Sequence, residues 1–354
     1  MRAAVLVDEG VAATAIVVRN EPVPVPGIGE VRVRITCAAL NHLDVWIRKG
    51  MPSVPKPRIM GADAVGVIDA IGAGADAALD IAGLAIGDRV VLDPGASCGA
   101  CRACASGETS LCPSFRVLGE HVAGTHAEYV VLPAIAAHAA PAHLDDLAAA
   151  ALTLTFATAW RMLFSRARTR ASDRVLVWGA SSGVGCAALQ LCAAAGVETI
   201  ATTRGAAKAD ALHALGADHV IVTGSADDLG DRVTSAVADI TEGEGVDVAF
   251  DHLGKVAWEP SMVALTRGGR YVTCGASTGG APHANVTRLF WKQLSMLGST
   301  MASRSDVRDM LTFVERHSIV PHVDASFALV GVVAAHEHLE GADHIGKVVL
   351  RVRD

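Results

Sequence analysis

The chain has 354 residues, with 30 lysine and arginine residues against 37 aspartate and glutamate residues, and its formal net charge is −7 at pH 7. Hydrophobic residues make up 51% of it, so the chain can bury a large core, and its length predicts two or three domains. The acidic balance argues against general binding to nucleic acid or to an anionic membrane, because such binding needs a basic surface.

The length of the apolar runs and the number of cysteines bear on the cellular compartment of the protein. No apolar stretch reaches the roughly 18 residues that a transmembrane helix needs. Asp8 interrupts the apolar start of the chain, where a signal peptide would need an unbroken core. We therefore expect a cytoplasmic protein with reduced thiols and no membrane partner. In that compartment, eight cysteines indicate metal binding or chemistry before disulfides.

The first 135 residues predict many short strands. Arg32 and Arg34 alternate with apolar residues, as in a strand that buries one face. Clusters of glycine and proline separate the runs, which predicts a barrel or a sandwich. The predicted strands lie at 4–7, 31–35, 65–68, 89–92 and 129–132.

From about residue 144 the pattern alternates between helices and strands. The first helix is predicted at 144–151, with Asp145 and Asp146 near its N-terminus, where the helix dipole favours acids. The alternation predicts an α/β fold with a doubly wound parallel sheet. Strands are expected at 174–178, 199–202, 219–222, 246–250, 271–274 and 294–301, and helices at 183–195, 207–215 and about 227–241.

The strand at 174–178 runs directly into the glycine-rich turn GASSGVG at 179–185, which opens a helix. Glycines allow a sharp turn and the close approach of a pyrophosphate, and the helix N-terminus offers free N–H groups. Ala180 and Ser182 replace the first two glycines of the G-x-G-x-x-G pattern, and the Ser182 hydroxyl is a candidate phosphate contact. We predict a nucleotide-binding turn; an ordinary turn of small residues is the alternative.

The end of the next strand favours NADPH over NADH. An acid there would bind the ribose hydroxyls of NAD, whereas basic residues suit the 2′-phosphate of NADP. The segment contains Thr203, Arg204 and Lys208, and no acid appears before Asp210. The alternative is that Arg204 and Lys208 are only solvated surface residues.

A segment at 94–115 carries four cysteines with the spacing C-x2-C-x2-C-x7-C. Four thiolates suit one tetrahedral zinc without an open coordination position, so the predicted zinc is structural. Free cysteines or an iron–sulfur centre are the alternatives. The predicted ligands are Cys98, Cys101, Cys104 and Cys112, whereas the other cysteines are expected to be buried packing residues: Cys37, Cys186, Cys192 and Cys274.

The order of these segments resembles the medium-chain dehydrogenase/reductase superfamily over nearly the whole chain. GDRV at 87–90 and GKVVL at 346–350 are also similar to it. The resemblance implies a nicotinamide cofactor, a cleft between two domains, and a homodimer or homotetramer in which the strand at 294–301 pairs with its copy. It implies a GroES-like domain at 1–148, with the zinc lobe at 94–115, that is completed by 296–354, and a Rossmann domain at 149–295.

Zinc enzymes of this superfamily hold a catalytic metal with a Cys, a His and either a second Cys or an acid. The matching positions here are Asn41, Ala62 and Leu154, which cannot make an ordinary catalytic zinc site. The segment ALNHLD at 39–44 instead resembles the L-N-x-x-D segment of quinone reductases, in which the asparagine lies beside the nicotinamide. The chain therefore resembles a hybrid with structural zinc and without catalytic zinc.

This hybrid predicts an NAD(P)H-dependent reductase of a small molecule that carries a polarised C=C bond (an enone) or a quinone. Hydride addition to such acceptors spreads the charge, so hydrogen-bond donors can suffice in place of a Lewis acid. The catalytic candidates are Asn41, His42 and Asp44, although His42 could be a loop histidine and Asp44 could cap a helix that begins at Val45.

Two other functions stay open. One is an alcohol or aldehyde dehydrogenase with an atypical metal site, and the other is a non-catalytic NADPH-binding protein. The atypical site would draw on His42, Asp44, Asp63, His121 and His126.

The resemblance also implies cofactor contacts by position, among them a threonine that faces the nicotinamide and the lysine of the C-terminal GKVVL segment. The expected contacts are Asn41, Thr158, Ser182, Gly183, Val184, Thr203, Arg204, Lys208, His252, Leu253, Gly275, Ala276 and Lys347.

Overall fold

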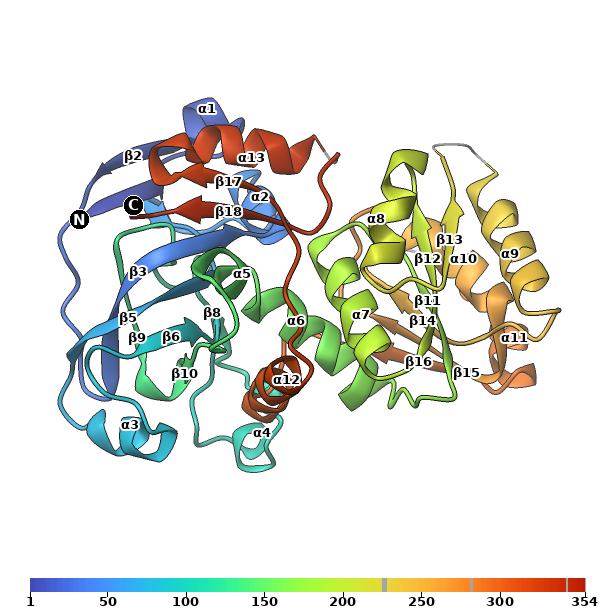
Figure 1. Ribbon diagram of the computed structural model, residues 1–354, viewed down its shortest axis with the longest axis horizontal. Helices are drawn as coiled ribbons and strands as arrows, with labels where there is room; N and C mark the ends of the chain where they lie inside the picture. Colours follow the sequence, from blue (N-terminus) through green and yellow to red (C-terminus); the bar gives the residue numbers. More distant parts are fainter. Residues whose placement is uncertain (225–227, 281–282, 342, 354) are drawn as a thin grey trace. The chain divides into compact units, whose positions relative to one another are not determined.

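The computed structural model describes residues 1–224, 228–280, 283–341 and 343–353, and its strands form sheets in two separate units (Figure 1). Unit 1 consists of Met1–Thr155 and Ala302–Asp354, and unit 2 consists of Phe156–Met301. Unit 1 is rich in antiparallel strands, whereas the main sheet of unit 2 is parallel. The predicted α/β class, with a β-rich part and a part built on a parallel sheet, is confirmed.

The main sheet of unit 1 is built around β3 (Glu30–Leu40). Val31, Val33 and Ile35 are buried along this strand, and Arg32 and Arg34 alternate with them as predicted. The sheet has seven strands in the order β10-β6-β5-β3-β18-β17, with β9 also paired to β3. The other bounds are β5 Asp63–Ile71, β6 Arg89–Leu92, β9 Tyr129–Pro133, β10 Ala137–Ala139, β17 Val323–Ala328 and β18 Lys347–Arg351.

The C-terminal segment returns to this sheet. β18 pairs antiparallel with β3, so that Val348 lies opposite Leu40, and β17 lies parallel to β18. On the other side of β3, Ala39 lies opposite Asp63, the first residue of β5. Three segments that are far apart in the sequence therefore meet at the C-terminal end of β3.

Short strands and helices complete unit 1. One small sheet has the order β2-β1-β4, with β1 Arg2–Leu6, β2 Ile16–Asn20 and β4 Arg58–Ile59, and the other pairs β7 Gly95–Ala96 with β8 Arg116–Val117. The helices are α1 Ala12–Ala15, α2 His42–Arg48, α3 Asp76–Ala82, α4 Arg102–Ala105, α5 Asp146–Ala150, α12 Arg304–Arg316 and α13 Val332–Glu340.

The sheet of unit 2 is parallel throughout, in the order β13-β12-β11-β14-β15-β16. Figure 1 shows α7 and α8 on one side of this sheet and α9 and α10 on the other. The bounds are β11 Arg174–Val177, β12 Glu198–Thr203, β13 His219–Val222, β14 Val246–Asp251, β15 Leu265–Thr273, β16 Ser295–Gly298, α6 Thr153–Trp160, α7 Gly183–Ala194, α8 Ala209–Ala214, α9 Leu229–Ile240, α10 Lys255–Ala264 and α11 Val286–Trp291.

The structure corrects some local predictions. The helix expected to begin at Val45 begins at His42, because the Asp44 carboxylate caps its first turn at Asn41. The helix expected from about Asp227 begins, as described, at Leu229, and Asp227 lies outside the described residues. Cys274 is half-buried and not fully buried, because it follows the end of β15.

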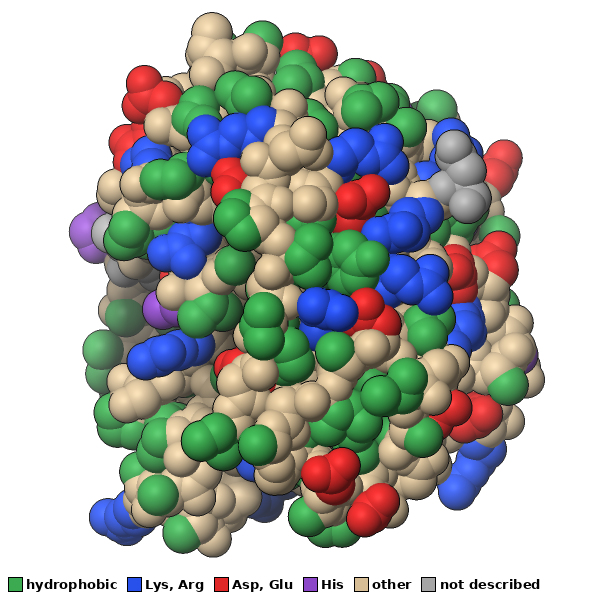
Figure 2. Space-filling model, turned by 90° about the vertical axis from the view of Figure 1, so that its left-hand side faces the viewer, with side chains coloured by type: hydrophobic (Ala, Val, Ile, Leu, Met, Phe, Trp, Pro, Cys, Tyr) green, Lys and Arg blue, Asp and Glu red, His purple; other side chains and the backbone are tan. Residues whose placement is uncertain are grey.

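Across the described residues, no helix combines the length and the apolar character needed to cross a bilayer. On the face drawn in Figure 2, lysine and arginine side chains are interspersed with aspartate, glutamate and hydrophobic ones. That face therefore offers no continuous basic surface for a phosphate backbone.

Candidate functional site

The end of β3 gathers three polar residues in unit 1. Asn41 follows β3 directly, Asp63 begins β5, and Lys347 begins β18. The strand registers place all three side by side, and each is buried: Asn41 is 6% exposed, Asp63 is 0% exposed and Lys347 is 3% exposed. Buried charges are costly unless they are paired, so this arrangement needs strong internal hydrogen bonds.

Those hydrogen bonds are present. The Lys347 Nζ donates to Asn41 Oδ1 at 2.6 Å and to Asp63 Oδ2 at 2.7 Å, and Asn41 Nδ2 donates to the same Asp63 oxygen at 3.0 Å. The other carboxylate oxygen, Asp63 Oδ1, accepts from Thr153 Oγ1 at 2.8 Å and from the Leu154 backbone N–H at 2.6 Å. The carboxylate thus has four donors, and the ion pair is fully hydrogen-bonded.

Asp44 holds the turn that carries Asn41. Its carboxylate accepts from the Asn41 backbone N–H at 2.8 Å and from the Gly61 N–H at 2.9 Å, so it closes the first turn of α2. Burial raises the pKa of the Asp44 carboxyl, and the charge of His126 and the two backbone donors oppose this rise. This placement gives Asp44 a structural role in positioning Asn41.

His42 is exposed in the first turn of α2. The centroid of its ring is 6.1 Å from that of His344 and 6.3 Å from that of Trp46. Its neighbours thus differ from those of the buried Asn41.

His126 is fully buried beside Gly61, and neither of its ring nitrogens has a hydrogen-bond partner of normal geometry among the described residues. Burial lowers the pKa of His126, and the charge of Asp44 opposes this. Its ring packs edge-on against the buried His336 ring at 6.5 Å between centroids. Burial, with the charges of His126 and Arg48, lowers the pKa of His336 to about 3.

The five residues considered for an atypical metal site do not form one donor set. Both oxygens of Asp44 and of Asp63 accept hydrogen bonds from the protein, and His121 Nδ1 accepts from the Val117 N–H at 3.2 Å. Within the described part of the chain, only the four cysteines bring three or more Cys, His, Asp or Glu ligand atoms within 4.8 Å of one another. The arrangement therefore does not support the atypical metal site.

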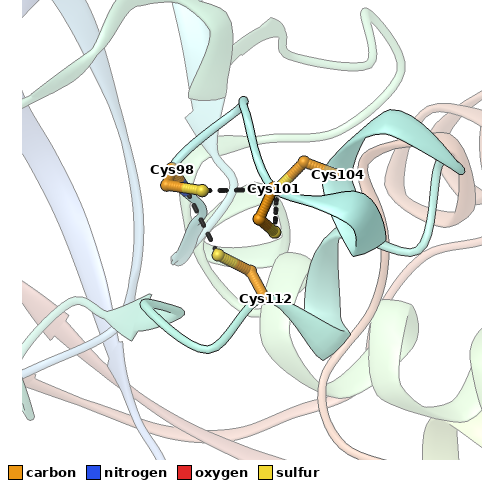
Figure 3. Close-up of side chains that lie close together, drawn as sticks. All are labelled: Cys98, Cys101, Cys104 and Cys112. Carbon is orange, nitrogen blue, oxygen red and sulfur yellow. Dashed lines mark hydrogen bonds between the residues drawn. The ribbon is translucent and has the colours of Figure 1, made fainter.

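The four cysteines meet in the lobe between β7 and β8, and Figure 3 shows their side chains turned toward one another. The Sγ atoms of Cys101 and Cys104 are 3.5 Å apart, and those of Cys98 and Cys104 are 3.9 Å apart. Four sulfurs bound tetrahedrally to one zinc lie about 3.8 Å from each other. The donor set therefore fits a structural zinc.

The glycine-rich turn of unit 2 packs so closely against its protein neighbours that side chains at Gly179 and Gly185 would not fit. Gly179 has φ +59°, and a Cβ there would lie 2.9 Å from His252 Nε2; a Cβ on Gly185 would lie 2.6 Å from the Gly179 carbonyl oxygen. Ser182 is the N-cap of α7: its Oγ accepts from the Gly185 N–H at 3.0 Å and lies 2.9 Å from His252 Nε2. The Ser182 hydroxyl, which the sequence predicts as a phosphate contact, therefore bonds to other residues of the protein.

Other predicted cofactor residues gather at the carboxyl ends of the strands. His252 and Leu253 follow β14, and Gly275 and Ala276 follow β15, where a Cβ on Gly275 would lie 2.9 Å from the His252 carbonyl oxygen. In a parallel sheet this edge is where nucleotides bind. At the end of β12, Thr203 is buried and Arg204 is exposed.

The remaining predicted residues lie on different elements. Gly183 and Val184 open α7, Lys208 ends a short turn before α8, and Thr158 is buried in α6. Asn41 and Lys347 belong to unit 1.

Sequence reasoning missed two supporting acids. Asp63 was considered only as a metal ligand, and the Asp251 carboxylate, which accepts from the Leu253 and Gly254 N–H groups at 2.8 and 3.0 Å, was not considered. A charged residue at the end of an otherwise apolar strand is the signal that could have identified both.

Comparisons with known proteins agree with this architecture. Residues 27–142 match the family model described as an alcohol dehydrogenase GroES-like domain, and residues 183–316 match that of a zinc-binding dehydrogenase. A solved NAD-dependent alcohol dehydrogenase is 42% identical with a TM-score of 0.92, and 100% of each chain is covered.

Two enoyl-CoA reductases are also similar. The acryloyl-coenzyme A reductase of Metallosphaera sedula is 28% identical over 94% of this chain and 95% of its own. A 2-octenoyl-CoA carboxylase reductase, solved with NADP and 2-octenoyl-CoA, is 27% identical with a TM-score of 0.87, over 96% of this chain and 82% of its own.

Proposed function

The chain belongs to the medium-chain dehydrogenase/reductase superfamily and is an NAD(P)-dependent oxidoreductase. We propose that it transfers hydride from NADPH to a polarised C=C bond or a quinone without a catalytic zinc. The acceptor class includes enones and enoyl thioesters, in which a carbonyl group can take up the charge that hydride delivers. The names of the two enoyl-CoA reductases support this class.

One observation carries the proposal: an ion pair and an amide replace a metal-ligand set at the end of β3. Asn41 bonds to Lys347 and Asp63, and the two other positions that match metal ligands are Ala62 and Leu154. These residues supply an amide, a methyl and an isobutyl group, none of which is a usual zinc ligand. A positive charge is nevertheless present, on the Lys347 ammonium.

This environment suits acceptors that delocalise charge. Reduction of a simple ketone concentrates charge on one oxygen and usually needs a Lewis acid, whereas an enolate or a hydroquinone can be stabilised by hydrogen-bond donors. NADPH supplies the hydride when bound. The chain contributes the Asn41 amide as a donor, and Asp44 and Asp63 hold that amide in place.

We propose NADPH as the cofactor because Arg204 follows β12 on an exposed position, where its guanidinium can pair with a 2′-phosphate. The N-terminus of α7 and the glycine turn would receive the pyrophosphate. The proposed contacts are Asn41, Thr158, Ser182, Gly183, Val184, Thr203, Arg204, Lys208, His252, Leu253, Gly275 and Ala276.

We also propose that Cys98, Cys101, Cys104 and Cys112 hold one structural zinc, since their sulfur spacing suits tetrahedral coordination. A closed set of four thiolates leaves no position for substrate. The metal would therefore crosslink the lobe and take no part in hydride transfer.

A homodimer through the edge strand β16 is the proposed assembly, with a homotetramer as the alternative. Among the described strands, β16 pairs only with β15. Met296 on this strand is 43% exposed, and the nearby Phe290 and Trp291 are 62% and 65% exposed. An edge strand with exposed apolar neighbours is protected when it pairs with a copy of itself.

The experiment combines metal analysis with a substrate panel of enones, enoyl-CoA thioesters, quinones, aldehydes and alcohols, each with NADPH and NADH. We expect one zinc per chain and turnover of a conjugated acceptor or a quinone that a chelator of loosely bound zinc does not inhibit. Two zinc ions per chain and chelator-sensitive alcohol oxidation would overturn the proposal. Tight NADPH binding without any turnover would instead indicate a binding protein.

A further inference from the structure

We propose that Lys347 and Asp63 form an orienting pair that fixes the Asn41 amide as a hydrogen-bond donor to the carbonyl oxygen of the acceptor. This inference rests on the proposed function, and it assigns Lys347 a positioning role that differs from a direct cofactor contact. The Asn41 amide has two ends of opposite chemistry, because its oxygen accepts and its nitrogen donates hydrogen bonds.

The charges on either side of Asn41 allow one orientation of its amide. An ammonium group can only donate, so Lys347 Nζ requires the amide oxygen at 2.6 Å. An ionised carboxylate can only accept, so Asp63 Oδ2 requires the amide nitrogen at 3.0 Å. A flipped amide would set donor against donor and acceptor against acceptor in the same two contacts. One Nδ2 hydrogen is then directed to Asp63, and in our proposal the second hydrogen donates to the acceptor.

Neighbouring contacts hold the Asn41 backbone and the Asp63 carboxylate in place. Thr153 and the Leu154 N–H fix the other oxygen of Asp63, and Asp44 fixes the Asn41 backbone. These partners come from α6 and α2, and Asp63 itself from β5, so several elements constrain the amide. A donor that is held before the substrate arrives does not have to reorganise during the reaction, and for that reason it stabilises developing charge effectively.

The hydride from C4 of the reduced nicotinamide bonds to the β-carbon of an enone or enoyl thioester. The C=C electron pair shifts to form a Cα=C bond, and the carbonyl pair moves onto oxygen to give an enolate. The free Nδ2 hydrogen of Asn41 stabilises that oxygen, and a proton from solvent then bonds to the α-carbon as the carbonyl reforms. Lys347 keeps its proton throughout.

Kinetics of single and double variants test whether Lys347 acts through Asn41. Lys347→Met should lower kcat by about 10- to 100-fold with an NADPH KM within about threefold of wild type, and Lys347→Arg should restore part of the loss. In an Asn41→Ala background, Lys347→Met should lower kcat by less than about threefold more. Losses that multiply in the double variant would overturn the proposal. Lys49→Met, at an exposed lysine, is the control for the substitution.

A second variant covers the case in which Lys347→Met leaves the Asp63 charge unpaired and the protein does not fold. Lys347→Met/Asp63→Asn removes both charges and retains an amide in place of the carboxylate. We expect it to fold and to show the same loss of kcat, because Asn41 is then free to flip. Wild-type kcat in this folded variant would contradict the orienting role.

A readout without substrate separates this inference from the proposed function. The chain has three asparagines, Asn20, Asn41 and Asn285, so selective 15N labelling of asparagine side chains gives three NH2 signals. Asn20 and Asn285 are exposed, so the buried Asn41 amide should exchange its hydrogens with solvent most slowly. In Lys347→Met this exchange should be at least about tenfold faster. An unchanged exchange rate would overturn the orienting role of Lys347, whereas a wild-type enzyme that reduces no acceptor would overturn only the proposed function.

Discussion

The buried imidazole of His336 should make the protein lose stability in mild acid. His336 is 0% exposed on α13, and neither ring nitrogen has a hydrogen-bond partner among the described residues. Burial is the main cause that lowers its pKa to about 3, and the charges of His126 and Arg48 add to it. The imidazole is therefore neutral in the folded protein and becomes charged when the chain unfolds below about pH 6.5.

The sign and size of the effect follow from proton linkage. Between pH 6.5 and pH 3 the unfolded chain binds one more proton at His336 than the folded chain does, so the free energy of unfolding falls as the pH falls. Above pH 6.5, His336 is neutral in both states and the protein has lost none of this stability. At pH 5 the loss amounts to about 2 kcal/mol, at a slope of at most about 1.4 kcal/mol per pH unit.

Urea denaturation from pH 7.5 to pH 4.5 measures this slope in wild type, His336→Leu and His336→Gln. Both variants remove the titrating group, so both should lose the pH dependence that His336 causes. Between pH 7.5 and pH 5, the free energy of unfolding of each variant should therefore fall by about 2 kcal/mol less than that of wild type. Only His336→Leu also removes buried polar atoms, and we expect it to be at least as stable as wild type at pH 7.5. Variants that keep the wild-type slope would refute the reasoning.

The remaining predictions concern the backbone, the metal and the cofactor. Gly61→Ala should cost about 3 kcal/mol in urea denaturation, because φ is +96° and its Cβ would lie 2.3 Å from a buried imidazole carbon; Gly83→Ala, with φ +66° and open space, should cost about 1 kcal/mol, and equal costs would contradict the steric argument. Cys112→Ser should abolish zinc retention and lower the melting temperature by more than about 5 °C, whereas the control Cys186→Ala should retain one zinc; zinc retained in Cys112→Ser would exclude this ligand. Arg204→Ala should raise the KM for NADPH by about tenfold and leave that for NADH unchanged, and equal changes for both would count against the phosphate contact.

Local sequence patterns predicted much of the architecture. The parallel sheet of unit 2 could be predicted because β11 to β14 are short runs rich in β-branched residues that alternate with helices, as at β13, where the predicted 219–222 agrees with the structure. The cysteine spacing predicted one cluster, and the four sulfurs meet. The helix at 144–151 formed as α5, with Asp145 accepting from the Ala148 N–H at 2.8 Å.

The chemistry at the end of β3 was only partly predictable. The sequence identifies Asn41 from its segment, but it does not predict the hydrogen bond from Lys347, which lies 306 residues away along the chain. The contact exists because β18 pairs with β3, and no short window of sequence contains that register. The burial of His126 against His336 depends in the same way on how α13 packs.

The amino-acid order alone thus determined the periodicities, the glycine turn and the cysteine spacing, because each is set by the backbone geometry of a few consecutive residues. Tertiary structure alone decided which charges became partners. Desolvation and pairing act between side chains that the folding of distant strands brings together, so the Lys347–Asp63 pair and the donor face of Asn41 emerged only with the fold.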